Sequence, residues 1–293
     1  MSEILDFAIE TARKAGQLLC ELYHQQHTVC LKSSDIDVVT EADMDSERLI
    51  VEAIRARFPD HRILSEEGLG NWQAEPDDTP RLWLVDPLDG TVNYAHGYPF
   101  WGVSLALAEH GRVVTAVTYD PLRDETFCAE RHQGAWCDEQ RMSISNVASL
   151  RDALVATGFA YKRATVADNN LAEFGAVMPR VQGVRRAGAA VLDMAHLADG
   201  RLDGYWEMRL KPWDWAAGWQ LIEESGGQPT LSPATDPFTA GYSNCYRLRI
   251  ARRNETLAAD RRSKGLRSSR SLRPQEIRSR KLLRILAVAP QMV

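Results

Sequence analysis

The sequence predicts an α/β protein, because segments with helical periodicity alternate with segments typical of β-strands. Residues 3–23 place apolar side chains every three to four positions, the pattern of an amphipathic helix. Residues 83–85 form an apolar run typical of a buried strand. Between 103 and 119, two alternating apolar runs flank His110-Gly111, which predicts a β-hairpin. A chain of 293 residues with 44% hydrophobic residues can bury a sizeable core around these elements.

The other elements follow in chain order from local spacing and turn residues. A short β-branched stretch at 38–40 precedes a helix at 43–58, and a strand at 61–65 ends in two acids. We expect further strands at 134–138, 142–145, 154–157 and 204–207, and further helices at 91–96, 170–181, 191–199 and 215–225.

Charge is distributed unevenly along the chain. Residues 1–246 carry 21 basic and 37 acidic side chains, a net charge of −16, whereas residues 247–293 carry 14 basic and 3 acidic ones, a net charge of +11. We therefore expect a folded domain over residues 1–240 and an atypical basic tail over residues 241–293. A tail whose charges are mostly of one sign is typical of a disordered segment or of an arm that binds a partner. The abrupt reversal also motivates the hypothesis that a reading-frame shift near residue 240 replaced the native end.

Cysteine usage and hydropathy favour a cytoplasmic protein. The chain has 5 cysteines, an odd number without a Cys-x-x-Cys pair, which argues against a disulfide framework or a zinc ribbon. No apolar stretch reaches about 18 residues, and the N-terminus has no basic segment followed by an apolar run. We therefore expect neither a signal peptide nor a membrane span.

An acidic turn follows the apolar run at 83–85. Asp86 and Asp89 lie three residues apart at the expected end of a strand, where two carboxylates repel each other unless a proton or a cation lies between them. Carboxylate, carbonyl and water oxygens suit magnesium, manganese or calcium. Gly90 and Thr91 could then open a helix, whose free N–H groups favour an anion such as phosphate. The turn therefore predicts a metal site and a phosphate site side by side.

Three further acids lie where a strand or loop meets the start of a helix. Taken alone, Asp43 is typical of a helix N-cap and Glu66 of a solvated surface. Asp214 lies at the N-terminal end of the helix expected at 215–225. Together with Asp86 and Asp89 they make one layout, because unrelated surface acids would scatter over helix faces.

This layout resembles the inositol monophosphatase family, in the superfamily that also holds fructose-1,6-bisphosphatases and 3′-phosphoadenosine phosphatases. The resemblance covers roughly residues 3–235. It rests on Asp86-Pro-Leu-Asp-Gly-Thr91, Glu66-Glu67, Val39-Thr40-Glu-Ala-Asp43 and Trp213-Asp214-Trp-Ala-Ala-Gly218. It implies a layered αβαβα sandwich of the sugar-phosphatase type and a homodimer.

The resemblance also implies two or three Mg²⁺ ions. The implied ligands are Glu66, Asp86 and the Leu88 carbonyl for a first ion, Asp86, Asp89 and Asp214 for a second, and Glu66 and Asp43 through waters for a weaker third. Metals would neutralise charge on the transferring phosphoryl group and lower the pKa of a bound water.

Roles for other residues follow from the same resemblance. The implied catalytic set is Thr91, Asp43 and Glu66, with the Thr91 hydroxyl orienting the attacking water and Asp43 supporting it. Backbone N–H groups of Gly90 and Thr91 would bind the phosphate. The implied contacts to the rest of the substrate are Asp89, the Ala190 backbone, Glu207 and Asp214, with Lys32 in a loop near the site.

The expected substrate is a small polyol phosphate, with myo-inositol monophosphate favoured and inhibition by Li⁺ expected from the family. Glu207 lies seven residues before Asp214, the spacing of inositol-type members. Histidinol-phosphatase-like members have a Gly-Gly-Asp segment and a Pro-Tyr-Asp motif, where this chain has Gly188-Ala-Ala-Val and Pro212-Trp-Asp. Ala189 stands where many members have Ser or Thr, a departure that would loosen specificity.

Two alternatives stay open. The first is a phosphatase of histidinol phosphate or of another sugar or nucleotide monophosphate. The second belongs to another class: an accessory protein of transcription and RNA processing on the same fold. Basic residues of the tail could contact RNA phosphates, giving salt-dependent binding. Against this, the tail has no aromatic residue after Tyr246, and base stacking would need them.

Overall fold

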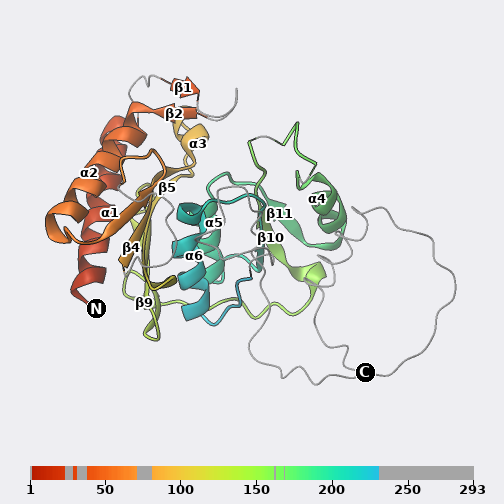
Figure 1. The fold of residues 1–293 in the computed structure, drawn as a ribbon. Coiled ribbons are helices and arrows are strands. Elements are labelled where there is room, and N and C mark those ends of the chain that lie inside the picture. The colour runs from red at the N-terminus through yellow and green to blue at the C-terminus, as the bar shows by residue number, and fades with distance from the viewer. Residues whose placement is uncertain are drawn as a thin grey trace.

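Five layers alternate helices and sheets in the protein (Figure 1). The computed structural model describes residues 2–23, 29–31, 38–70, 81–161, 163–167 and 169–230. Helices α1 (Glu3–Leu22) and α2 (Glu41–Arg57) cover one face of a seven-stranded sheet. Helices α5 (Ala190–Ala198) and α6 (Pro212–Glu224) lie between that sheet and a three-stranded one, whose outer face is covered by α4 (Leu171–Val177). The predicted αβαβα sandwich is therefore confirmed.

The large sheet has the strand order β3-β4-β5-β6-β7-β8-β9. β3 and β4 are parallel and all other neighbours are antiparallel. Its strands are β3 (Arg62–Ser65), β4 (Arg81–Asp89), β5 (Gly102–Glu109), β6 (Arg112–Asp120), β7 (Glu125–Glu130), β8 (Gly134–Cys137) and β9 (Gln140–Arg141). The hairpin predicted between 103 and 119 is β5–β6.

The small sheet has the order β11-β10-β12, with both pairs parallel. Its strands are β10 (Leu154–Thr157), β11 (Gly183–Arg185) and β12 (Gly204–Trp206). The remaining elements are the antiparallel pair β1 (Val29–Leu31) and β2 (Val38–Thr40), helix α3 (Thr91–Ala95), and 3-10 turns at Leu150–Asp152 and Met178–Arg180.

The large sheet has a separate hydrophobic core on each face. Along β4, Trp83 and Val85 pack with α1 and α2, whereas Leu82 and Leu84 pack with α5 and α6. A strand that is buried on both faces is apolar at every position, which explains why the sequence of β4 lacks the alternation of a surface strand. Because Gly218 has no Cβ, α6 can approach α5 closely; a Cβ at this position would lie 2.6 Å from Met194 Cβ.

The small sheet also separates two clusters. Ala156 and Tyr205 face α5 and belong to the central core, whereas Val155 and Trp206 face α4. Because β10 and β12 pair in parallel with Thr157 opposite Trp206, both strands end at the same edge. That edge lies beside the site described below.

Two predicted elements differ in the structure. Residues 142–145 are not a strand. The Met142 N–H still donates to Ala135 of β8 (2.9 Å), but the Ile144 N–H donates to the Ser225 carbonyl beyond α6 (3.2 Å). The helix expected at 170–181 ends at Val177 and continues as the 3-10 turn Met178–Arg180, which contains a proline.

The remaining predictions concern Lys32, the basic tail, the cysteines and membrane-spanning helices. Lys32 and the basic tail at 241–293 lie outside the described residues. Cys20, Cys128 and Cys137 are free thiols. None of the described helices is long and apolar enough to cross a membrane.

Candidate active site

The acidic turn at the end of β4 departs from regular strand geometry. Asp86 pairs with Ser104 and Asp89 with Gly102, so β4 has one extra residue between them. Pro87, which has no N–H to give to the ladder, lies within this bulge. Side chains three residues apart would face opposite sides of a regular strand, and the extra residue turns Asp86 and Asp89 toward one side.

The chain then reverses at Gly90. Its φ of +91° lies in the left-handed region, where glycine is favoured. A Cβ would also lie 3.1 Å from the Phe100 carbonyl oxygen and 3.2 Å from the Cβ atoms of Trp101 and Ala189. Helix α3 starts at the next residue, Thr91, so the glycine allows the helix to begin directly beside the two aspartates.

Asp43 holds the Thr91 hydroxyl. Its Oδ1 accepts from Thr91 Oγ1 (2.8 Å), and its Oδ2 accepts from the Thr40 N–H (2.8 Å) and the Thr40 hydroxyl (2.5 Å). Thr91 Oγ1 also lies 3.1 Å from the Leu88 carbonyl oxygen. The interpretation of Asp43 as an N-cap is corrected: Thr40 is the N-cap of α2 and Asp43 is its third helical residue. Its carboxylate can therefore reach both the cap and Thr91.

A buried glutamate shapes the turn that carries Glu66. Glu47 on α2 has no exposed surface (0%). Its carboxylate accepts hydrogen bonds from the Ser65 hydroxyl (2.7 Å), the Glu67 N–H (2.6 Å) and the Leu69 N–H (2.6 Å). Because these donors flank Glu66, the turn after β3 is attached to α2 on both sides of it.

Two acids accept N–H groups at the starts of helices. Asp89 Oδ2 accepts from the Val191 N–H (2.8 Å) in the first turn of α5, next to Ala190, the first residue of that helix. Asp214 is the third residue of α6 and accepts from the Lys211 N–H (2.6 Å). The starts of α5 and α6 are thereby brought beside the acidic turn.

Burial and mutual repulsion raise the pKa values of the carboxyl groups at this turn. Burial raises the pKa of Asp86 well above its usual value, and repulsion from Glu66, Asp89 and Asp214 raises it further. The pKa of Asp214 is raised in the same way, first by burial and then by Glu66 and Asp89. Burial raises the pKa of Asp89 to about 7, although the Val191 N–H opposes this. Such carboxyls ionise readily only when a cation joins them.

Glu207 lies just beyond the end of β12. The Tyr205 hydroxyl donates to its Oε2. Burial raises the pKa of Glu207 to about 7, whereas the Tyr205 hydrogen bond and the charge of Arg186 lower it. Asp193, in the first turn of α5, is a further buried acid; burial, and then repulsion from Glu207 and Asp89, raises its pKa.

The structure thus brings together all the predicted site residues that it describes, and it adds three that were not predicted: Glu47, Tyr205 and Asp193. Asp193 had a usable signal, because it is an acid within a helix, Ala190–Ala198, whose other residues are almost all apolar. Glu47 looked like one acid among several on an amphipathic helix, and Tyr205 like an ordinary strand residue.

Another acidic group lies away from this turn. Ligand atoms of Asp120, Glu125 and His196 are all within 4.8 Å of one another. Both carboxylates are already paired, however, Asp120 with Arg123 (2.6 Å) and Glu125 with Arg201 (2.6 and 2.7 Å). Hydrogen bonding to Arg201 lowers the pKa of Glu125, and burial lowers that of His196 to about 4. We therefore interpret this group as an ion-pair cluster that needs no metal.

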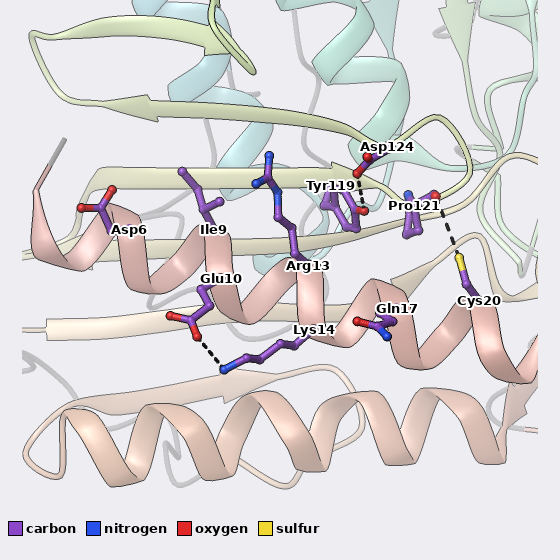
Figure 2. A pocket seen from close by; sticks show the side chains of 10 residues that line it. All are labelled: Asp6, Ile9, Glu10, Arg13, Lys14, Gln17, Cys20, Tyr119, Pro121 and Asp124. Carbon is purple, nitrogen blue, oxygen red and sulfur yellow. Dashed lines mark hydrogen bonds and ion pairs between the residues drawn. The ribbon is translucent and has the colours of Figure 1, made fainter.

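A hollow of about 700 Å³ follows the exposed side of α1, also away from the turn (Figure 2). Several of its charged side chains already have partners: Lys14 pairs with Glu10 (2.6 Å), Arg13 with Asp138 (3.4 Å), and Asp124 accepts from the Tyr119 hydroxyl (2.8 Å). It lacks a group of convergent, unpaired acids. Its lining is Asp6, Ile9, Glu10, Arg13, Lys14, Gln17, Cys20, Tyr119, Pro121 and Asp124.

Comparison with known proteins shows which family the chain resembles. The sequence profile of the inositol monophosphatase family matches residues 1–264. The chain is 42% identical over 223 residues to the inositol-1-monophosphatase of Synechocystis sp., covering 76% of this chain and 77% of that protein. It is 38% identical over 256 residues to a protein of Pseudomonas aeruginosa named Nus factor SuhB, covering 84% and 94%.

A solved structure gives the same result. The inositol monophosphatase of Anabaena (Nostoc) sp. superposes with a TM-score of 0.71 at 39% identity, covering 84% of this chain and 89% of that one. On sequence and on structure, this chain belongs to the inositol monophosphatase family.

Proposed function

We propose that the protein hydrolyses small phosphate monoesters of polyols, with myo-inositol monophosphate as the expected substrate. The observation that carries this proposal is the convergence of Glu66, Asp86, Asp89 and Asp214 on one turn, next to a threonine hydroxyl held by Asp43. Membership of the inositol monophosphatase family supports the reaction class.

The donor set fits Mg²⁺. The acids are buried and repel one another, which a divalent cation would relieve, and hard oxygen ligands are those that Mg²⁺ prefers. We propose two or three ions, held by Glu66, Asp86, the Leu88 carbonyl, Asp89 and Asp214, with Asp43 near a third. When bound, they would neutralise phosphoryl charge and provide a water of lowered pKa.

The residues of the chain itself would orient the reactants. The Thr91 hydroxyl donates its one hydrogen to Asp43 or to the Leu88 carbonyl, so its lone pairs are free to accept a hydrogen from the attacking water. In-line attack needs this water opposite the leaving oxygen. Backbone N–H groups of Gly90 and Thr91 would bind phosphate oxygens.

The alcohol part of the substrate would be bound on the other side of the acidic turn. Glu207, held by Tyr205, would accept a hydrogen bond from a polyol hydroxyl. Asp89, Asp214 and the backbone of Ala190 would complete the contacts. Lys32 as a further contact, Li⁺ inhibition and a homodimer stay predictions from the family. A cytoplasmic location stays a prediction from cysteine usage and hydropathy.

A second candidate function is an accessory role in transcription or RNA processing. It is favoured by the name of the P. aeruginosa relative, Nus factor SuhB, and by the net charge of +11 over residues 247–293. Contacts between basic side chains and RNA phosphates would weaken steeply as salt rises.

Phosphate release from a substrate panel tests the first proposal. The panel is inositol 1-phosphate, histidinol phosphate, fructose 1,6-bisphosphate and 3′-phosphoadenosine 5′-phosphate, each with Mg²⁺ or EDTA. Asp89→Asn should lower turnover by more than about 100-fold. Replacing a residue that only hydrogen-bonds to a metal ligand already lowers metal affinity or activity about 10–100-fold, and Asp89 is proposed as a ligand itself. Asp60→Asn, an exposed acid, is the control and should leave turnover unchanged. Turnover that survives EDTA contradicts the mechanism, and RNA binding without any turnover favours the accessory role.

A further inference from the structure

A buried amide connects the two strand ends that lie beside Glu207. Asn170 precedes α4 and is 1% exposed. Its Nδ2 donates to the Thr157 hydroxyl (2.8 Å) and to the Gly158 carbonyl (2.7 Å), and its Oδ1 accepts from Trp206 Nε1 (2.7 Å). Both hydrogens of the amide nitrogen are therefore used, one on the last residue of β10 and one just beyond it, while the oxygen binds the last residue of β12.

A fourth hydrogen bond completes this network between the ends of β10 and β12. The Thr157 hydroxyl donates to the Trp206 carbonyl (2.6 Å), so the hydroxyl accepts from Asn170 and donates to β12 at the same time. Thr157 and Trp206 are register partners in the parallel pair β10–β12. The next residue on each strand, Gly158 and Glu207, must then also lie side by side.

Gly158 and the Glu207 carboxylate are in direct contact. A Cβ added to Gly158 would overlap all three atoms of that carboxyl group, so only glycine leaves room for it. The Tyr205 hydroxyl donates to Oε2 of the same carboxylate. The carboxylate is therefore fixed by a phenol and by the backbone of Gly158, and the position of that backbone is set by Asn170.

We propose that Asn170 is a positioning residue for substrate recognition. Through Gly158 and Trp206 it holds the Glu207 carboxylate where a polyol hydroxyl can donate to it; this rests on the function proposed above. The side-chain hydrogen bonds of Asn170 go to the ends of β10 and β12, on the side of the small sheet that packs with α4, and not to the acidic turn. Its loss should therefore affect the alcohol part of the substrate and spare the phosphate.

Asn170→Asp tests this with a minimal change. Asn170 has a φ of +68°, which Asp also tolerates, so the backbone is undisturbed. The new carboxylate oxygen replaces the Nδ2 donor and faces the Gly158 carbonyl, where it repels. Asn169→Asp is the matched control: it makes the same chemical change one residue earlier, where the amide donates to the Arg163 carbonyl and accepts from the Leu171 N–H.

The readout compares two substrates in the full-length protein with Mg²⁺: inositol 1-phosphate and phenyl phosphate, which has no polyol hydroxyls. A hydrogen bond to a charged group is worth about 1.5–3 kcal/mol, so kcat/KM for inositol 1-phosphate should fall roughly 10–100-fold, mainly through KM. Hydrolysis of phenyl phosphate should change by less than about twofold. Asn169→Asp should change neither.

A second variant approaches the same contact from the other side. Gly158→Ala inserts a methyl group into the carboxylate's position and should produce the same selective loss, even if Asn170→Asp fails to fold. Equal losses on both substrates in the variants, or an unchanged KM for inositol 1-phosphate, would overturn the positioning role. A wild-type protein that hydrolyses neither substrate would overturn the proposed function and this inference with it, and the two failures are thereby distinguished.

Discussion

Replacing Glu47 should both destabilise the fold and weaken metal binding, because its carboxylate is the buried acceptor for the turn around Glu66. Glu47→Ala removes three hydrogen bonds to Ser65, Glu67 and Leu69 at once. Each is worth about 1.5–3 kcal/mol, but neighbouring losses do not add fully, so we expect a cost of about 3–5 kcal/mol. For a chain of this size that is a Tm lower by roughly 6–20 °C.

Glu47→Gln distinguishes the hydrogen-bonding roles of the two carboxylate oxygens. Oε1 accepts from Ser65 and Leu69, and the amide oxygen can keep both bonds, whereas the amide nitrogen would face the Glu67 N–H donor to donor. One unsatisfied donor costs about 1–3 kcal/mol, so the Tm should fall by roughly 2–12 °C, less than for alanine. The order wild type, Gln, Ala is therefore part of the prediction.

Calorimetry and a Mg²⁺ titration of phosphatase activity measure the two effects. Because the turn around Glu66 is loosened, half-maximal activity should need roughly 10–100-fold more Mg²⁺ in Glu47→Ala. Glu52→Ala, on the exposed side of the same helix, is the control and should cost less than about 0.5 kcal/mol. A shift of about 2 °C corresponds to less than 1 kcal/mol. A Tm of Glu47→Ala within about 2 °C of the control would therefore refute the reasoning.

Two other predictions concern the acidic turn. Gly90→Ala should destabilise the protein by about 1–3 kcal/mol and lower its activity, because φ is +91° and the new Cβ would lie 3.1 Å from the Phe100 carbonyl oxygen; urea unfolding and phosphate release measure this. With EDTA, Tm should fall as pH rises from 5 to 8. In the folded protein the pKa values of Asp89 and Glu207 are about 7, whereas in the unfolded chain they are near 4. The folded protein therefore holds protons that stabilise it at low pH, and this stabilisation is lost as pH rises through about 7. Mg²⁺ should therefore raise Tm more at pH 8 than at pH 5, and an equal rise would contradict the cation's role.

The acidic turn could be predicted from sequence because its parts are consecutive. An apolar run, a proline, two acids and a glycine each have a local meaning, and together they predicted a strand that ends in a turn beside a helix start. The structure adds the bulge between Asp86 and Asp89 and the left-handed conformation of Gly90. The αβαβα layering was expected from the family resemblance, and local periodicity predicted single elements of it, since β4 is apolar on both faces and α1 on one.

Residues that depend on distant partners were beyond local reasoning. Glu47 is spaced like any acid on α2, and only the arrival of the turn after β3 makes it an acceptor of three bonds. Ile144 has the sequence of a strand, but its N–H pairs with Ser225 after α6. Asn170 is predicted as a helix start, which is correct, but its amide bonds across two strands come from the tertiary fold.

The carboxylates of the acidic turn come from different layers of the sandwich. Asp86 and Asp89 belong to the sheet, Asp43 to α2 on one face and Asp214 to α6 on the other, and the Val191 N–H of α5 binds Asp89 directly. A partly unfolded form that releases either helical layer therefore lacks part of the constellation. Any cation that binds all of these layers would act as a cross-link between them and suppress such local opening. The proposed metal site is therefore complete only when the large sheet and the two helical layers that flank it are docked.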